Sequence, residues 1–218
     1  VPQVGIDDNR ILRVNSEPFF PVSVWIPWSL VMAVQENAEA RDLESNLYHL
    51  ARNGVNTVVV LLEQPRLDEV FALAERFGMK IILELRQPRE PAPELFTAWQ
   101  EHVARELTSA RRANPALLAY LLIDEPAWGG TPAAQVKAGY DILRRIDPEH
   151  PVWINEAPRN RVADLLDYAS GCDIYGCDIY PVPEGCRHSD SDNQTLSSVG
   201  EYTRRMVTIA DGRKPVWM

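Results

Sequence analysis

The chain has 218 residues, of which 45% are hydrophobic and 24% charged, and its 31 acidic against 22 basic residues give a net charge of −9. This ordinary globular composition excludes fibrous and disordered classes. The acidic balance and the lack of a basic run argue against a nucleic-acid partner. No apolar stretch approaches the roughly 18 residues that a membrane span needs, so none is expected.

The chain begins at Val1 rather than at Met, which suggests that a preceding segment was removed and that the protein is secreted or periplasmic. Its three cysteines, Cys172, Cys177 and Cys186, allow at most one disulfide. A disulfide scaffold is therefore excluded, and a buried structural role is expected for each thiol. Nothing in the sequence fixes the oligomeric state.

Seven short runs rich in β-branched, aliphatic or aromatic residues recur along the chain and predict strands. The runs at 58–62 and 117–123 are almost continuously apolar, which is typical of central parallel strands covered on both faces. The predicted strands span residues 20–25, 57–63, 80–85, 118–124, 152–155, 174–180 and 214–217.

Six stretches with helical spacing lie between these strands, at residues 39–53, 67–77, 94–113, 132–146, 161–168 and 196–210. Strands that alternate with helices predict βαβ units and a parallel sheet covered by helices. A doubly wound sheet usually has a glycine-rich loop after its first strand, and here that strand runs into Trp25-Ile26-Pro27-Trp28 instead. The pattern therefore favours a TIM-type (β/α)8 barrel.

Residues 1–218 show no linker and are predicted to form a single domain. Residues 11–14 and 18–20, joined by a turn at Asn15-Ser16, predict a β-hairpin at the bottom of the barrel. Only seven strands are found, and a complete barrel typically needs about 250 residues. We therefore expect a barrel that lacks its eighth strand at the C-terminus, with the edges of the first and seventh strands exposed.

In such a barrel the working groups follow the carboxyl ends of the strands. Carboxylates or aromatic rings stand there on nearly every strand, and such a cluster of carboxylates calls for a metal, a basic ligand or acid–base chemistry. The four histidines are scattered, which argues against a metal site. No Gly-x-Ser-x-Gly nucleophile elbow is present, which argues against serine catalysis, and neither cysteine catalysis nor a cofactor is predicted. The strand-end residues are Trp25, Trp28, Glu63, Glu84, Arg86, Asp124, Glu125, Asn155, Glu156, Asp178, Tyr180 and Trp217.

The most informative motif is Asp124-Glu125-Pro126, which directly follows the apolar fourth strand. A carboxyl group at the edge of an apolar barrel, beside a second carboxyl, has its ionised form disfavoured. Such a group suits the role of a general acid.

Several segments in this order resemble the retaining glycoside hydrolases of the large barrel clan that includes β-galactosidases, β-mannanases and cellulases. They are residues 11–15, 18–22, 53–56, 77–81, 124–126, 178–181 and 214–217. The resemblance implies a (β/α)8 barrel, a carbohydrate substrate and Glu125 as the acid/base. The chain departs from the clan by carrying Asp124 where an Asn holds the sugar 2-hydroxyl, and by ending at Met218 without a counterpart of the nucleophilic Glu.

Glu156 and Asp178 are the candidates for the second catalytic carboxylate. Asp178 belongs to a repeat of Cys-Asp-Ile-Tyr at an offset of five, so Asp173 in the first copy should face the opposite way. The other strand-end residues, Glu84 excepted, are predicted to bind substrate: Trp25, Trp28, Glu63, Arg86, Asp124, Asn155, Tyr180 and Trp217.

The sequence thus predicts a glycoside hydrolase that cleaves a β-linked carbohydrate with Glu125 as general acid/base. One alternative is a non-catalytic carbohydrate-binding barrel that lacks the nucleophile. The other is a metal-dependent hydrolase with oxygen ligands from Glu63, Asp124 and Glu156.

Overall fold

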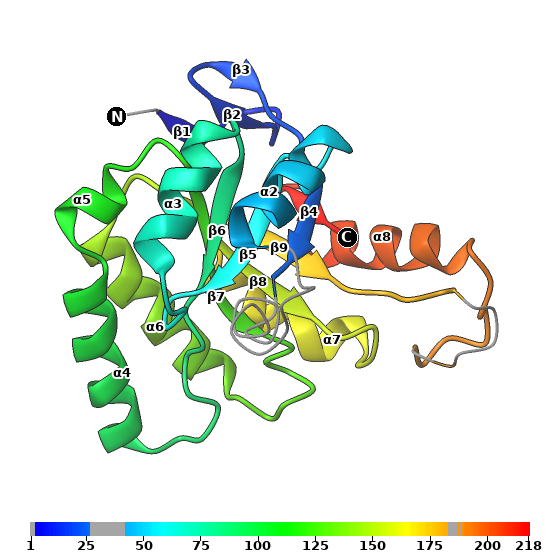
Figure 1. Cartoon of the computed structure of the whole chain (residues 1–218). Coiled ribbons are helices and arrows are strands. Elements are labelled where there is room, and N and C mark those ends of the chain that lie inside the picture. The colour runs from blue at the N-terminus through cyan, green and yellow to red at the C-terminus, as the bar shows by residue number, and fades with distance from the viewer. Residues whose placement is uncertain (1–2, 27–41, 183–186, 188) are drawn as a thin grey trace.

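A seven-stranded parallel sheet forms the centre of the computed structural model, which describes residues 3–26, 42–182, 187 and 189–218 (Figure 1). Neighbouring strands in the sheet are also neighbours in the chain, and each pairs in parallel with the next. The strands are β4 (Ser23–Trp25), β5 (Thr57–Leu61), β6 (Lys80–Glu84), β7 (Leu117–Asp124), β8 (Val152–Glu156), β9 (Ile174–Cys177) and β10 (Val216–Trp217).

Helices follow the strands and cover one face of the sheet (Figure 1). The fold is a TIM-type α/β barrel represented by seven strands, as the sequence predicts. Within the described residues β4 and β10 form the two edges and do not pair with each other. The helices are α2 (Leu43–Arg52), α3 (Leu67–Arg76), α4 (Pro93–Glu106), α5 (Ser109–Arg112), α6 (Ala133–Ile146), α7 (Val162–Leu165), the 3-10 helix η1 (Leu166–Gly171) and α8 (Ser198–Ile209).

Two apolar cores lie on the two faces of the sheet because alternate residues of a strand point to opposite sides. The outer core fills the space between the sheet and the helices. The inner core lies inside the curl of the sheet and takes residues from five adjacent strands, among them Val59, Ile82, Leu121, Trp153 and Ile174.

A small antiparallel sheet closes the end of the barrel where the strands begin, which we call the floor. It consists of β1 (Val4–Ile6), β2 (Leu12–Val14) and β3 (Glu17–Pro18), and the first of these was not predicted. Asn15 and Ser16 form its turn with φ of 52° and 70°, as a primed hairpin turn requires. Val4 and Leu12 pack into the inner core. The opposite end, where the strands finish, is the mouth.

Three predicted elements differ from the structure. The predicted helix at 94–113 is two helices, because the Thr108 side chain accepts a hydrogen bond from the Arg111 N–H at 3.2 Å and so caps a new helix, α5. The predicted helix at 161–168 is a single turn, α7, followed by η1, and the strand predicted at 174–180 ends at Cys177. Among the described residues, no helix combines the length and apolarity needed to cross a bilayer.

Candidate active site

The strand ends at the mouth bring several predicted residues to the inner face of the barrel. Glu84 and Asn155 each follow an inner-core residue by two positions, so their side chains point to the same side as that core. Asp178 follows Ile174 by four positions, and its carboxylate accepts a hydrogen bond from the side chain of Asn155. These side chains, together with Asp124, form what we call the mouth cluster.

Asp124 reaches the inner face through an irregularity in β7. Leu121 is paired with Trp153 and Asp124 with Asn155, so an advance of three residues along β7 matches an advance of two along β8. Without this extra residue Asp124 would point outward. The Asn155 Nδ2 donates a hydrogen bond of 3.0 Å to Asp124 Oδ1, which joins the two strands at the mouth.

Asp178 is a partly buried carboxyl group beside a second one. Burial, followed by the negative charge of Asp124, raises the pKa of Asp178 to about 6, although hydrogen bonds from Tyr180 and Asn155 act in the opposite direction. Burial and the charge of Asp178 likewise raise the pKa of Tyr180 to about 12, so this tyrosine is a hydrogen-bond donor at neutral pH.

Glu84 lies at the same face on β6 and is only 6% exposed. The Trp25 indole donates to its Oε2 at 3.0 Å, and Arg86 Nε donates to its Oε1 at 3.1 Å. Burial raises the pKa of Glu84, and the Arg86 and Trp25 contacts limit the rise. A hollow of about 410 Å³ opens here, lined by Glu84, Arg86, Gln87, Arg89, Ile123 and Asp124.

Glu125, the predicted acid/base, stands in the turn after β7 and is half-buried. Its φ of 47° is left-handed, and its N–H donates to the Asn155 carbonyl at 2.6 Å. The negative charge of Glu125 contributes to raising the pKa of both Tyr180 and Glu156. The turn therefore holds Glu125 beside the mouth cluster.

Glu156 does not join the mouth cluster, contrary to our expectation. Because it follows Asn155 on β8, it points to the outer face, where it is fully buried. Its Oε2 accepts from the Ala127 N–H and its Oε1 from the Tyr175 hydroxyl, each at 3.2 Å. Burial raises the pKa of Glu156 to about 8, so at neutral pH it is mostly protonated and unsuited to nucleophilic attack.

Glu63 also lies apart from the mouth cluster. Its carboxylate lies 3.4 Å from the His102 imidazole on α4, on the helical side of the barrel. The trio of the metal-hydrolase alternative, Glu63, Asp124 and Glu156, is thus spread over both faces. Among the residues that the structure describes, no three His, Cys, Asp or Glu side chains are grouped as metal ligands would be.

Two of the three cysteines, Cys172 and Cys177, are free and buried in the outer core. Burial raises the pKa of both thiols, which keeps them protonated and unreactive. Cys186 and the predicted sugar platform Trp28 lie outside the described residues.

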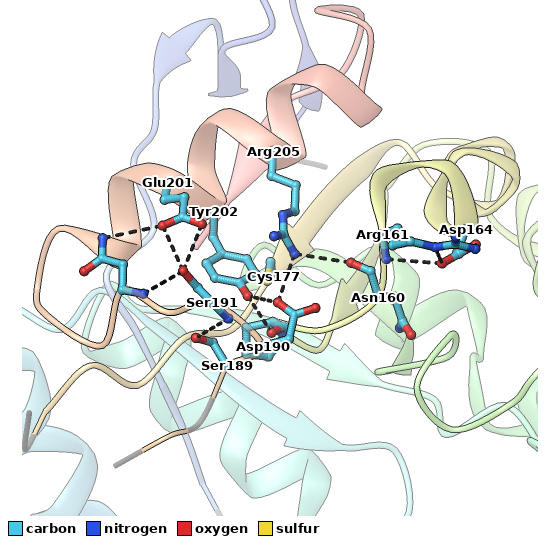
Figure 2. A network of polar contacts seen from close by, with 12 residues as sticks. Asn160, Arg161, Asp164, Cys177, Ser189, Asp190, Ser191, Glu201, Tyr202 and Arg205 are labelled. Atoms are coloured by element: carbon cyan, nitrogen blue, oxygen red, sulfur yellow. Dashed lines mark hydrogen bonds and ion pairs between the residues drawn. The ribbon is translucent and has the colours of Figure 1, made fainter. Parts of the chain in front are cut away.

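A polar network ties the loops that follow β8 and β9 to helix α8 (Figure 2). Tyr202 donates to the Pro158 carbonyl at 2.8 Å and also to Asp190, while Arg205 contacts both Asp190 and the Asn160 carbonyl at 3.2 Å. Ser191 donates to the Glu201 carboxylate at 3.0 Å. Both loops flank the mouth, so this network fixes one of its walls.

Comparison with protein-family models finds no match, and comparison with curated protein sequences finds none either. Solved structures do match. A glycoside hydrolase family 5 mannosidase from Rhizomucor miehei has a TM-score of 0.75 at 12% identity, over 98% of this chain and 71% of that one. The chain shares the barrel fold of glycoside hydrolases.

Two further structures extend this likeness. The β-glucuronidase of Parabacteroides merdae has a TM-score of 0.66 at 10% identity, and the GH2 β-galacturonidase of Eisenbergiella tayi has 0.68 at 14%. Each covers 99% of this chain, which spans only 26% and 38% of the two enzymes. The glycoside hydrolase barrel fold therefore corresponds to one part of each of these larger proteins.

One aromatic residue inside this barrel was not predicted to lie at the site. Trp153 lies in the inner core, with its ring centroid 6.5 Å from that of Trp25 and 5.4 Å from that of Trp217. Gly176 on β9 makes room for it, since a Cβ there would come within 2.3 Å of the Trp153 Nε1. Trp217 is thus partly buried against the inner core, whereas Trp25 is 42% exposed at the mouth. Strand alternation from Asn155 could have placed Trp153 inside.

Proposed function

We propose that the chain forms the active-site face of a glycoside hydrolase that cleaves β-linked carbohydrates, with Glu125 as general acid/base. The observation that carries this proposal is the convergence of Asp124, Asn155 and Asp178 from three adjacent strands, beside Glu125, at the mouth of a glycoside hydrolase-type barrel. Active sites of this fold occupy that end of the barrel.

The two carboxyl roles follow from position. Glu125 would protonate the departing glycosidic oxygen, and Asp178, which is mostly ionised above pH 6, would supply the second carboxylate. Because Glu156 is buried on the outer face, Asp178 is the better of the two candidates. On this proposal the acidic limb of kcat/KM lies near pH 6.

The neighbouring polar groups would orient the sugar. Asn155 and Asp124 offer one amide and one carboxylate to its hydroxyl groups, and Tyr180 adds a hydroxyl donor. The exposed part of Trp25 would pack against the sugar ring, and Arg86 lines the adjacent hollow.

The charge of the mouth favours an uncharged substrate. Four carboxyl groups gather there, from Glu84, Asp124, Glu125 and Asp178. They outnumber the two guanidinium groups of the adjacent hollow, of which Arg86 is paired with Glu84 and Arg89 with two main-chain carbonyls. A carboxylate on the sugar would be repelled. The proposed substrates are therefore neutral β-glycosides of the mannoside, glucoside or galactoside type rather than uronides.

The test is hydrolysis of a panel of aryl β-glycosides, including a β-glucuronide, by the wild type, Glu125→Gln and the control Glu149→Gln. Glu149 is exposed at the floor. We expect turnover of neutral glycosides, a loss of at least about 100-fold in Glu125→Gln and none in the control. Aryl leaving groups of lower pKa should reduce the rate loss in Glu125→Gln, because they depart with less protonation.

Two other outcomes would contradict the proposal. Sugar binding in calorimetry without turnover would instead support the non-catalytic carbohydrate-binding barrel. Activity that a chelator abolishes and a divalent ion restores would support the metal-dependent hydrolase.

A further inference from the structure

Arg89, in the loop after β6, contacts the main chain of the turn that carries Glu125. One guanidinium nitrogen donates to the Asp124 carbonyl at 2.6 Å and the other to the Glu125 carbonyl at 3.0 Å. A planar guanidinium with two parallel donors fixes the relative orientation of both carbonyl groups, which a single donor would not.

The turn needs such a restraint because its geometry is unfavourable for Glu125. A left-handed φ of 47° is uncommon for a residue with a side chain. Besides Arg89, the Glu125 carbonyl accepts from the Gly129 N–H at 2.9 Å, and the Glu125 N–H donates to the Asn155 carbonyl at 2.6 Å. The direction of the Cα–Cβ bond of Glu125 is therefore set by contacts of its own peptide groups.

Gly129 provides the space for the guanidinium. A Cβ at this position would lie 1.8 Å from Arg89 Nη1 and 3.1 Å from the Glu125 carbonyl oxygen. The guanidinium is the far end of a flexible side chain, so any larger residue would displace it. Arg89 and Gly129, forty positions apart in the chain, thus act together: one contacts the Glu125 turn and the other leaves room for that contact.

We infer that Arg89 is a positioning residue for Glu125, holding the acid/base carboxyl in its working direction through the two backbone carbonyls, with Gly129 as the space that this requires. The inference deepens the proposed function and rests on it for its kinetic consequences. Its structural part, that Arg89 sets the environment of the Glu125 carboxyl, can be tested without turnover.

The control is Arg112, which makes the same kind of contact elsewhere. Its guanidinium donates to the Leu107 carbonyl at 3.1 Å and to the Ile146 carbonyl at 2.7 Å, and like Arg89 it is half-buried. Arg112→Ala therefore removes an equivalent clamp, between α5 and the end of α6 and away from the mouth. It measures what the loss of such contacts costs the fold.

The kinetic experiment compares Arg89→Ala, Arg89→Lys, Gly129→Ala and Arg112→Ala. Displacement of a catalytic group by about 1 Å can cost about 100-fold in rate, so we expect kcat to fall by at least about tenfold in Arg89→Ala and Gly129→Ala, with KM within about twofold. Arg89→Lys should retain part of the rate, and added guanidinium chloride should partly restore Arg89→Ala. An unchanged kcat in Arg89→Ala, or an equal fall in Arg112→Ala, would overturn the inference.

The second experiment follows the carboxyl titration of Glu125 by carbon NMR, assigned by comparison with Glu125→Gln. We expect its midpoint to move in Arg89→Lys, which keeps the positive charge but cannot make the two parallel contacts, and to stay within about 0.2 pH units in Arg112→Ala. If the wild type hydrolyses no glycoside and the midpoint still moves, the proposed function fails and the clamp stands. If the midpoint does not move, the clamp is wrong whether or not the protein is a hydrolase.

Discussion

The pKa values of buried carboxyl groups shift in opposite directions at the two ends of the sheet. At the floor, Asp147 accepts from the Tyr120 hydroxyl at 2.6 Å and lies 2.9 Å from His150 Nδ1, and two backbone N–H groups also reach it. Burial alone would raise the pKa of Asp147, but these partners bring it well below its usual range. At the mouth, Asp178 and Glu84 keep raised pKa values.

The difference is one of partners rather than depth. Asp147 is surrounded by donors and is held ionised as a structural anchor. Asp178 faces Asp124, whose negative charge makes the ionised form of Asp178 more costly. A protein keeps such mutually unfavourable charges together where a substrate, and not the fold, makes use of them. The following predictions test this contrast in order of expected effect.

The largest effect is expected for Asp178→Asn at the mouth. It should lower kcat by at least about 100-fold, since a neutral amide cannot serve as the second carboxylate. Thermal unfolding should show no loss of stability, because removing a buried charge beside Asp124 relieves repulsion. An Asp178→Asn variant that is both active and less stable would show that Asp178 serves the fold and not catalysis.

The opposite result is expected for Asp147→Asn at the floor. Removing one partner of a buried charged network should cost about 3 kcal/mol of unfolding free energy at pH 7, with kcat unchanged in the folded protein. Folding lowers the pKa of Asp147. The extra unfolding free energy of the wild type over Asp147→Asn is therefore present above about pH 4 and shrinks as the pH falls below it. Urea denaturation at pH 7 and at pH 3 measures this directly.

Glu156 sharpens the comparison, since its pKa is raised to about 8 at a site without access to substrate. A carboxyl with a raised pKa binds more protons in the folded state, so its contribution to stability is complete below about pH 4.5 and is lost as the pH rises through 8. Glu156→Gln should abolish this slope of about 1.4 kcal/mol per pH unit between pH 4.5 and 8. Parallel stability–pH curves for the two proteins would contradict the prediction.

The smallest effect is expected for Glu63→Gln. Its pairing with His102 is partly exposed, so its loss should change the unfolding free energy by less than about 0.5 kcal/mol. Turnover should equal that of the wild type. A clear rise in KM would return Glu63 to the substrate-binding residues.

Local patterns were sufficient for the architecture. The spacing of apolar runs predicts all seven strands of the sheet, and Asn15-Ser16 predicts the hairpin turn, because both depend on neighbours within a few residues. The break between α4 and α5 was missed since Thr108 reads equally well as a helical residue until its capping bond to Arg111 is seen.

What the sequence by itself determined is the order of strands and helices and the set of strand-end candidates for the mouth. Which of those candidates lie at the mouth, and which of them face one another, was decided by the tertiary structure. The extra residue in β7 turns Asp124 inward, alternation along β8 turns Glu156 outward, and Arg89 reaches the Glu125 turn from another loop. The reason is physical: periodicity is a property of each segment alone, whereas register, bulges and long side-chain contacts arise only when separate segments pack together.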